Sequence, residues 1–233
     1  ITLSEIWNDR PMRELRQHML KGQSHAACTR CYEQEKSGFF SGRQSANKHH
    51  GHHIKRITEP EFKMTYWDIR FSNLCNFRCR TCGPIFSSNW FNDHVKLYGV
   101  VPDVLKRPMA RVEYTTGDED GMLAQMEPHI PHLEQVYFAG GEPLMDPQHY
   151  RILDMLEPYG EQIEIKYATN LSTLGIKGGR NVHDYWPNFR SVAVNVSIDG
   201  LDAVYNYIRG NSDWNAVVQN VQEIQKISNV SRI

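Results

Sequence analysis

Segments of strand length alternate with segments of helical periodicity from Met64 to the end of the sequence. Strands are predicted at 64–71, 135–139, 163–169 and 191–198, with a fifth beginning at Val230. Helices are predicted near 87–97, after the N-cap and proline of Asp146-Pro147, and over 212–227, where apolar side chains recur at helical spacing. Between these, 100–133 reads as an irregular or helical insertion. The alternation implies an α/β fold with a parallel sheet and right-handed crossovers.

The first 60 residues have a different character and predict a small, mainly helical segment. One helix opens at Pro11 and ends before Gly22, and a second carries Cys28 and Cys31. The polar stretch 41–55, with four histidines between positions 49 and 53, reads as a solvated loop or linker. We therefore divide the chain into 1–60 and 61–233. Because it lacks a starting methionine and stops where a strand begins, we expect a fragment cut at both ends.

Composition and charge exclude several classes of protein. Of the 233 residues, 40% are hydrophobic and 23% are charged, as in ordinary globular domains. A formal net charge of −1 gives no general attraction to nucleic acids or membranes. The sequence has neither a signal-peptide pattern nor an apolar run of about 18 residues, so we expect a cytoplasmic location. The odd number of cysteines, five in two local clusters, favours metal ligation over a disulfide framework.

Three of these cysteines, Cys75, Cys79 and Cys82, lie within eight residues directly after a predicted strand. Three thiolates on one short loop hold three irons of a [4Fe-4S] cluster and leave the fourth iron without a protein ligand. A zinc site is the alternative, but zinc usually takes four nitrogen or sulfur ligands, commonly as two separated pairs. A coincidental grouping is the third interpretation.

Small or polar residues follow the other predicted strands. The turn Gly140-Gly141-Glu142-Pro143 follows the second strand, Thr169-Asn170 the third, and Ser197 and Asp199 the fourth. Carboxyl ends of parallel strands meet at one edge of a sheet, where such folds carry their chemistry. Glycines allow the backbone to approach a ligand closely. The alternative interpretations are an ordinary strand-to-helix turn and polar residues tolerated at strand ends.

The fourth strand has two different faces. Val192, Val194, Val196 and Ile198 share one face, which suits packing under helices, whereas Ala193, Asn195 and Ser197 share the other. The charged residues Asp68, Arg70, Glu164 and Lys166 also lie on predicted strands and would face a substrate if they point inward. The sequence alone does not decide which face they occupy.

The C-x3-C-x2-C spacing, followed in order by these motifs, resembles the radical S-adenosylmethionine (radical SAM) superfamily. The resemblance covers about 7–47 and 64–233. It implies a partial (β/α)6 TIM-like barrel, here truncated at the fifth strand, with a [4Fe-4S] cluster on Cys75, Cys79 and Cys82. The family binds S-adenosyl-L-methionine to the open iron. Reductive cleavage then gives methionine and a 5′-deoxyadenosyl radical that abstracts a hydrogen atom from the substrate.

The resemblance also implies which residues contact S-adenosylmethionine. The backbone of Gly140, Gly141 and Glu142 is expected near the methionyl amino group. Further cofactor contacts are expected from Thr169, Asn170, Ser197 and Asp199, with Ser197 near the ribose or carboxylate. Arg209 follows at the distance where related enzymes place an arginine that pairs with the methionyl carboxylate. The residue before the third cysteine is usually aromatic and lies near the adenine. Here it is Thr81, so only its backbone is expected to contact the adenine.

Cys28 and Cys31 form a CxxC motif that is weak by itself. The segment from Trp7 to Gly38 resembles the auxiliary-cluster region of twitch- or SPASM-type radical enzymes, which implies a second iron–sulfur cluster. Such a cluster needs four ligands or a substrate-bound iron, and this segment supplies two cysteines. Zinc and no metal remain alternatives, as does a thiol redox protein that uses this pair.

Twitch-type relatives imply a peptide or small-molecule substrate and an electron donor such as a flavodoxin or ferredoxin. Arg78 and Arg80, beside the cysteines, are interpreted either as solvated or as raising the reduction potential of the cluster. The alternative function is a non-catalytic iron–sulfur or zinc-stabilised binding protein on the same fold. A purely structural metal would not require the glycine turn and Ser197, which argues against that alternative.

Overall fold

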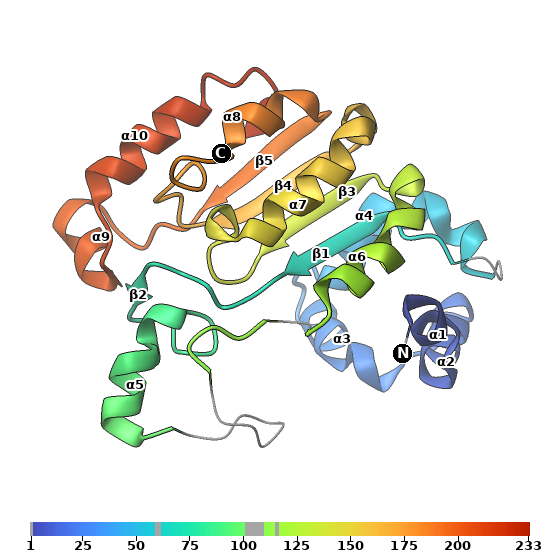
Figure 1. The fold of residues 1–233 in the computed structure, drawn as a ribbon. Coiled ribbons are helices and arrows are strands. Elements are labelled where there is room, and N and C mark those ends of the chain that lie inside the picture. Colours follow the sequence, from blue (N-terminus) through green and yellow to red (C-terminus); the bar gives the residue numbers. More distant parts are fainter. Residues whose placement is uncertain (1, 59–61, 101–109, 115–116) are drawn as a thin grey trace. The chain divides into compact units, whose positions relative to one another are not determined.

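The computed structural model describes residues 2–58, 62–100, 110–114 and 117–233 (Figure 1). It contains two compact units, 1–63 and 64–233, and each is described by itself. Much of the predicted insertion at 100–133 falls on 101–109 and 115–116, which lie outside the described residues. Of its described part, 119–132 is helical, as described below. Among the described residues, no helix is both long and apolar enough to cross a membrane.

The first unit is helical, as predicted. Its elements are α1 (Leu3–Asn8), α2 (Arg10–Leu20), the 3-10 helix η1 (Ala26–Cys28), α3 (Thr29–Lys36), α4 (Gly42–His50) and the 3-10 helix η2 (Gly51–Thr58). Few side chains here are buried, and aromatic contacts substitute for a large core. The ring of Trp7 stacks on Phe62 at 5.1 Å between centroids and carries the guanidinium of Arg16 at 3.9 Å.

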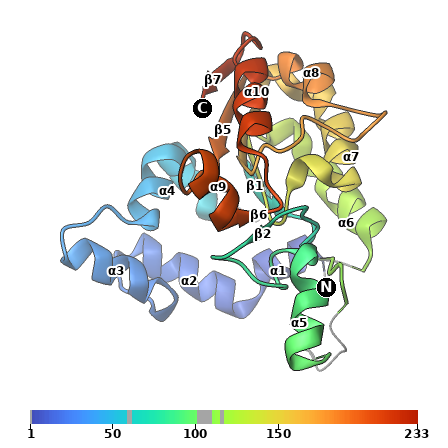
Figure 2. The same cartoon turned by 90° about the vertical axis from the view of Figure 1, so that its left-hand side faces the viewer.

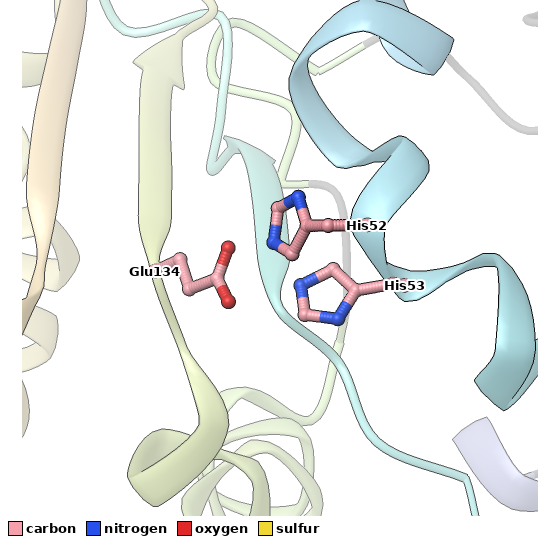
Figure 3. A group of neighbouring side chains, drawn as sticks. All are labelled: His52, His53 and Glu134. Carbon is pink, nitrogen blue, oxygen red and sulfur yellow. The ribbon is translucent and has the colours of Figure 1, made fainter.

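The prediction of a loop over 41–55 is wrong, because α4 and η2 occupy most of it. Ser41 begins α4 with a capping box: its side chain accepts from the N–H of Gln44, and the Gln44 side chain accepts from the N–H of Ser41. The polar composition concealed a strong helix start. Figure 3 shows His52 and His53 on η2. Their ring centroids are 3.9 Å apart. Glu134, also drawn there, precedes β3 of the second unit.

The second unit is built on a sheet of five parallel strands in the order β1-β3-β4-β5-β7. These strands are β1 (Tyr66–Arg70), β3 (Gln135–Ala139), β4 (Glu164–Thr169), β5 (Ser191–Val196) and β7 (Val230–Arg232). The predicted α/β fold is confirmed, with the strand expected at Val230 pairing beside β5. The arrowheads of β1, β4 and β5 point toward the side on which β2 and α9 lie (Figure 1).

Helices connect the strands. The α-helices are α5 (Phe91–Tyr98), α6 (Glu119–Met126), α7 (Pro147–Leu156), α8 (Val182–Tyr185), α9 (Asp202–Ile208) and α10 (Trp214–Ile224). The 3-10 turns are η3 (Ser88–Trp90), η4 (Glu127–His132), η5 (Pro143–Met145), η6 (Glu157–Gln162) and η7 (Trp186–Asn188). Helices α6 and α7 lie on the same side of the sheet in both views (Figures 1 and 2). Asp146 caps α7 as predicted, accepting from the N–H of Gln148.

Burial alternates along β1 and β4, and the registered pairing extends the two faces that this defines to β3 and β5. Trp67, Val136, Ile165 and Val192 are buried and contribute to the core. The residue that follows each of these lies on the other face of the sheet. Together they form one registered row across four strands: Asp68, Tyr137, Lys166 and Ala193. Ile198 departs from its predicted place under the helices, because β5 ends at Val196 and the side chain is 45% exposed.

A two-stranded antiparallel sheet was not foreseen from the sequence. Its strands are β2 (Arg78–Cys79), within the cysteine loop, and β6 (Arg209–Gly210), at the end of α9. In this pairing Cys79 lies opposite Arg209. Both strands lie beside α9 in the two views (Figures 1 and 2). The small sheet therefore joins the second cysteine to a segment 130 residues further along the chain.

Candidate functional site

The cysteine loop leaves the carboxyl end of β1 and is shaped by hydrogen bonds from buried polar side chains. Asn73, 4% exposed, donates from Nδ2 to the carbonyl of Pro84 at 2.8 Å. Ser87 donates to the carbonyl of Phe77 at 2.6 Å. The N–H of Cys82 donates to the carbonyl of Cys79 at 3.0 Å. Asn73 and Ser87 were missed by sequence reasoning, and an asparagine two residues before the first cysteine was the available signal.

Two of the three thiols, those of Cys75 and Cys79, lie against an apolar cluster and are met by N–H donors. Cys75 and Cys79 pack against Phe77, Tyr205 and Val217, which are at most 1% exposed. The sulfur of Cys75 accepts from the N–H of Phe77 at 3.5 Å. All five cysteines of the chain are unbridged thiols. Burial raises the pKa of Cys75 to about 11 and also raises that of Cys79. Both thiols are therefore neutral at pH 7, and a metal bound through their sulfur atoms would displace these protons.

The geometry of the loop fits a cluster better than a single zinc ion. The three sulfur atoms do not all lie within 4.8 Å of one another. Tetrahedral zinc, with bonds of about 2.3 Å to sulfur, would hold them about 3.8 Å apart. The buried hydroxyl of Tyr205, in the apolar cluster that holds Cys79, has no hydrogen-bond partner within the described part of the chain. A cluster with sulfur acceptors suits this wider arrangement and its nearby orphan donor.

The turn after β3 approaches the backbone of the cysteine loop. Gly140 has φ +115°, a conformation that favours glycine. The N–H of Gly141 donates to the carbonyl of Ser72 at 3.0 Å, and that of Glu142 to the carbonyl of Leu74 at 2.7 Å. A Cβ at Gly141 would lie 2.3 Å from the carbonyl oxygen of Leu74. Both glycines are therefore required for the turn to lie beside the first cysteine.

The carboxylate of Glu142 is turned into the protein, where it joins two strand ends. It is 1% exposed and accepts from the hydroxyl of Thr169 at 2.6 Å, the N–H of Asn170 at 2.7 Å and the N–H of Leu144 at 3.2 Å. These donors lower its pKa, but desolvation by burial outweighs them and raises it to about 7. The side chain therefore stabilises the end of β4 and its own turn by accepting their hydrogen bonds.

The end of β4 reaches the first cysteine directly. The Nδ2 of Asn170 lies 3.7 Å from the sulfur of Cys75 and 3.1 Å from Oδ1 of Asn76. Asn76 also donates to the hydroxyl of Ser172 at 2.9 Å. Ser197, at the end of β5, donates its N–H to the carbonyl of Thr169 at 2.8 Å. The residues predicted after three different strands are thus brought to one edge.

Asp199 and Arg209 form an ion pair at the same edge, with 2.7 Å between Oδ2 and Nη2. The Nη1 of Arg209 lies 3.7 Å from the sulfur of Cys79. Thr81 lies in a turn and is exposed. Cys28 and Cys31 lie apart from these residues in the sequence, on η1 and α3 of the first unit, and both are half-buried.

Comparison with known proteins assigns the second unit. The model of the radical SAM superfamily matches residues 69–233, which is more than half of the chain. The chain belongs to the radical SAM superfamily. The radical SAM region begins at Ile69 in β1 and includes the cysteine loop, the glycine turn and the ends of β4 and β5. Comparison with curated proteins gives no match.

Among solved structures, the radical SAM chain is similar to Streptococcus suis SuiB bound to the precursor peptide SuiA, with a TM-score of 0.45 and 12% sequence identity. The alignment covers 89% of this chain and 46% of SuiB. The chain therefore spans about half the length of that structure.

Proposed function

We propose that the protein is a radical SAM enzyme that holds a [4Fe-4S] cluster on Cys75, Cys79 and Cys82. The observation that carries the proposal is the meeting of these thiols with the glycine turn and the ends of β4 and β5 at one edge of the sheet. When bound, the cluster supplies an open iron and one electron, which cleaves S-adenosylmethionine into methionine and a 5′-deoxyadenosyl radical. That radical takes a hydrogen atom from the substrate.

The protein's part is to bind and orient the reactants. Carbonyl oxygens of the Gly140-Gly141 turn offer acceptors for the methionyl amino group. Asn170 and Ser197 stand at the neighbouring strand ends as further polar contacts. Asp199 and Arg209 are also proposed contacts, although their ion pair must separate, or be shared, before Arg209 pairs with a methionyl carboxylate. The backbone of Thr81 is proposed to contact the adenine.

Strand parity supports a polar substrate. Asp68, Arg70, Glu164 and Lys166 all lie on the face opposite to the buried side chains of their strands, and they form two ion pairs there. An apolar substrate on this face would remove water from these charges without replacing its hydrogen bonds. We therefore propose a substrate that carries polar or charged groups, either a peptide or a small molecule.

The auxiliary segment is the second part of the proposal. We place the protein in the twitch- or SPASM-like branch, with Cys28 and Cys31 contributing ligands to a second iron–sulfur cluster. We propose a flavodoxin or ferredoxin as the electron donor. The 3-10 turn η1 runs directly into α3, so both thiols are carried on one continuous helical segment.

Anaerobic reconstitution with iron and sulfide, followed by dithionite and S-adenosylmethionine, tests the function. We expect 5′-deoxyadenosine from the wild-type protein and none from Cys79→Ala. Cys28→Ala is the matched control, because it removes a thiol outside the triad and is expected to retain this cleavage. Equal product from Cys79→Ala would contradict the proposal. A cluster or zinc that persists without any cleavage would support the non-catalytic binding protein instead.

A further inference from the structure

Cys79 is distinguished by a guanidinium group beside its sulfur. Arg209 directs Nη1 toward that sulfur at 3.7 Å and Nη2 toward Oδ2 of Asp199 at 2.7 Å. Its side chain is 12% exposed, so the group is largely removed from water. The guanidinium therefore bridges a thiol and a carboxylate in surroundings where charge interactions are strong.

The backbone fixes this arrangement. Cys79 and Arg209 are paired residues of β2 and β6, and the N–H of Arg80 donates to the carbonyl of Ile208 at 2.8 Å. The guanidinium carbon lies 5.9 Å from the centroid of the Tyr205 ring. The pairing of β2 with β6 thus places Arg209 beside the sulfur of Cys79 and limits the conformations that its long side chain must give up to make this contact.

Two buried donors in this region have no hydrogen-bond partner among the residues that the structure describes. They are the Nε of Arg209 and the hydroxyl of Tyr205. Leaving such a buried group unpaired is unfavourable, because it has lost its hydrogen bonds to water without gaining others. Both lie close to Cys79, since Arg209 directs Nη1 toward its sulfur and Tyr205 belongs to the apolar cluster against which Cys79 packs. Their position favours an electron-rich acceptor at this side of the cysteine loop.

We propose that Arg209, held by Asp199, is a positioning residue that donates to the Cys79 thiolate and so raises the reduction potential of the cluster. This inference rests on the function proposed above. Reduction adds negative charge to the cluster and its thiolates, and a cationic donor to a ligand sulfur stabilises the reduced form more than the oxidised form. The negative charge of Asp199 offsets part of this effect.

The two arginines inside the cysteine loop are engaged elsewhere. Arg78 donates to Asp93 at 2.7 Å and to Asn211 at 3.1 Å. The guanidinium of Arg80 lies 3.9 Å from the ring centroid of Tyr207. Arg78 precedes Cys79 in the sequence and carries the same charge as Arg209, but its nitrogens bond to these other partners. It therefore provides a matched control for the loss of a positive charge.

The test is a redox titration of the reconstituted protein without S-adenosylmethionine, followed by electron paramagnetic resonance of the reduced cluster. We expect Arg209→Gln to shift the midpoint potential to more negative values. Asp199→Asn keeps an acceptor for Nη2 but removes the opposing charge, so we expect a shift to more positive values. Arg209→Lys retains the positive charge but not the two-pronged guanidinium donor. The midpoint potential should therefore shift less in this variant than in Arg209→Gln. Arg78→Gln should change little.

Equal potentials for Arg209→Gln and Arg78→Gln would overturn the inference. If Arg209→Gln takes up no cluster, Asp199→Asn decides: a positive shift supports the inference, whereas no shift or a negative one overturns it. A wild-type protein that binds no cluster would contradict the proposed function. A wild-type cluster that cleaves S-adenosylmethionine, with a potential insensitive to these variants, would contradict only the role of Arg209.

Discussion

The hydroxyl of Thr169 donates a hydrogen bond of 2.6 Å to the carboxylate of Glu142, joining the end of β4 to the glycine turn after β3. The next residue, Asn170, donates its N–H to the same carboxylate and its side-chain amide toward the sulfur of Cys75. One buried acid thus connects the glycine turn to the cysteine loop through the end of β4. Protonation of the Glu142 carboxylate therefore affects the stability of the strand ends and the cysteine loop that it connects.

Glu142→Gln should change how stability depends on pH. Burial raises the pKa of Glu142 from 4.5 to about 7, so the folded state binds a proton that the unfolded state releases in this interval. Stability is therefore lost as the pH rises from 4.5 to about 7, by roughly 3 kcal/mol. Urea unfolding at pH 5 and pH 8 should show this loss in the wild type relative to Glu142→Gln. Identical pH dependence in both proteins would contradict the prediction.

His149 should produce the opposite trend. Burial lowers the pKa of this histidine from 6.5 to about 3, so the unfolded state binds a proton first as the pH falls. Its contribution is fully present above pH 6.5 and is lost toward pH 3. In the wild type the two trends oppose each other between pH 4.5 and 6.5. Glu142→Gln leaves only the histidine, so its unfolding free energy should fall more steeply than that of the wild type as the pH is lowered through this interval.

Gly141→Ala should displace the cysteine loop. The new methyl group would lie 2.3 Å from the carbonyl oxygen of Leu74, a contact that backbone atoms must move to relieve. We expect a large loss of iron bound per chain after reconstitution. Gly83→Ala is the control, since it lies beside Cys82 but a Cβ there meets nothing within 4 Å. Equal iron content in the two variants would show that the close approach is not needed.

The double variant Cys28→Ala/Cys31→Ala tests the auxiliary site. If these cysteines hold a second [4Fe-4S] cluster, iron per chain should fall by roughly half. Metal analysis of the reconstituted protein, with zinc measured in the same samples, separates the alternatives. A loss of zinc with unchanged iron would indicate a zinc site, and no change in either would exclude both. Reversible disulfide formation in metal-free protein would favour the redox role.

Tyr167→Phe should destabilise the protein by about 1–3 kcal/mol, because it leaves a buried donor without an acceptor. The Tyr167 hydroxyl accepts from the indole N–H of Trp186 at 3.1 Å and lies 2.8 Å from Nε2 of His149. Tyr159→Phe, at an exposed position, should have little effect on chemical unfolding. Similar unfolding free energies for the two variants would contradict this prediction.

Much of the fold could be predicted because local signals agreed with the final structure. Apolar strand segments, the Asp146-Pro147 cap and the helical repeat near Trp214 each identify an element on its own. The polar helix α4 was missed because its capping box at Ser41 precedes a segment with almost no apolar side chains. The site residues could be named in order along the chain, since carboxyl ends of parallel strands converge.

Contacts between distant segments could not be predicted. The pairing of β2 with β6 involves two residues on each side and leaves no periodic pattern in the sequence. The direction of the Glu142 carboxylate depends on Thr169 and Asn170, donors on another strand. Likewise, the ion pair between Asp199 and Arg209 depends on how α9 returns to the cysteine loop.

The pairing of β2 with β6 also has a consequence for biosynthesis. Cys79 and Arg209 are 130 residues apart, so the contacts between β2 and β6 form late, after a long chain has been made. A ribosome must release the chain past Gly210 before this ribbon can form. Until then the three thiols belong to a nascent polypeptide that lacks this ribbon. For the proposed cluster, we expect iron and sulfide to be bound stably only after the α9 segment has been translated.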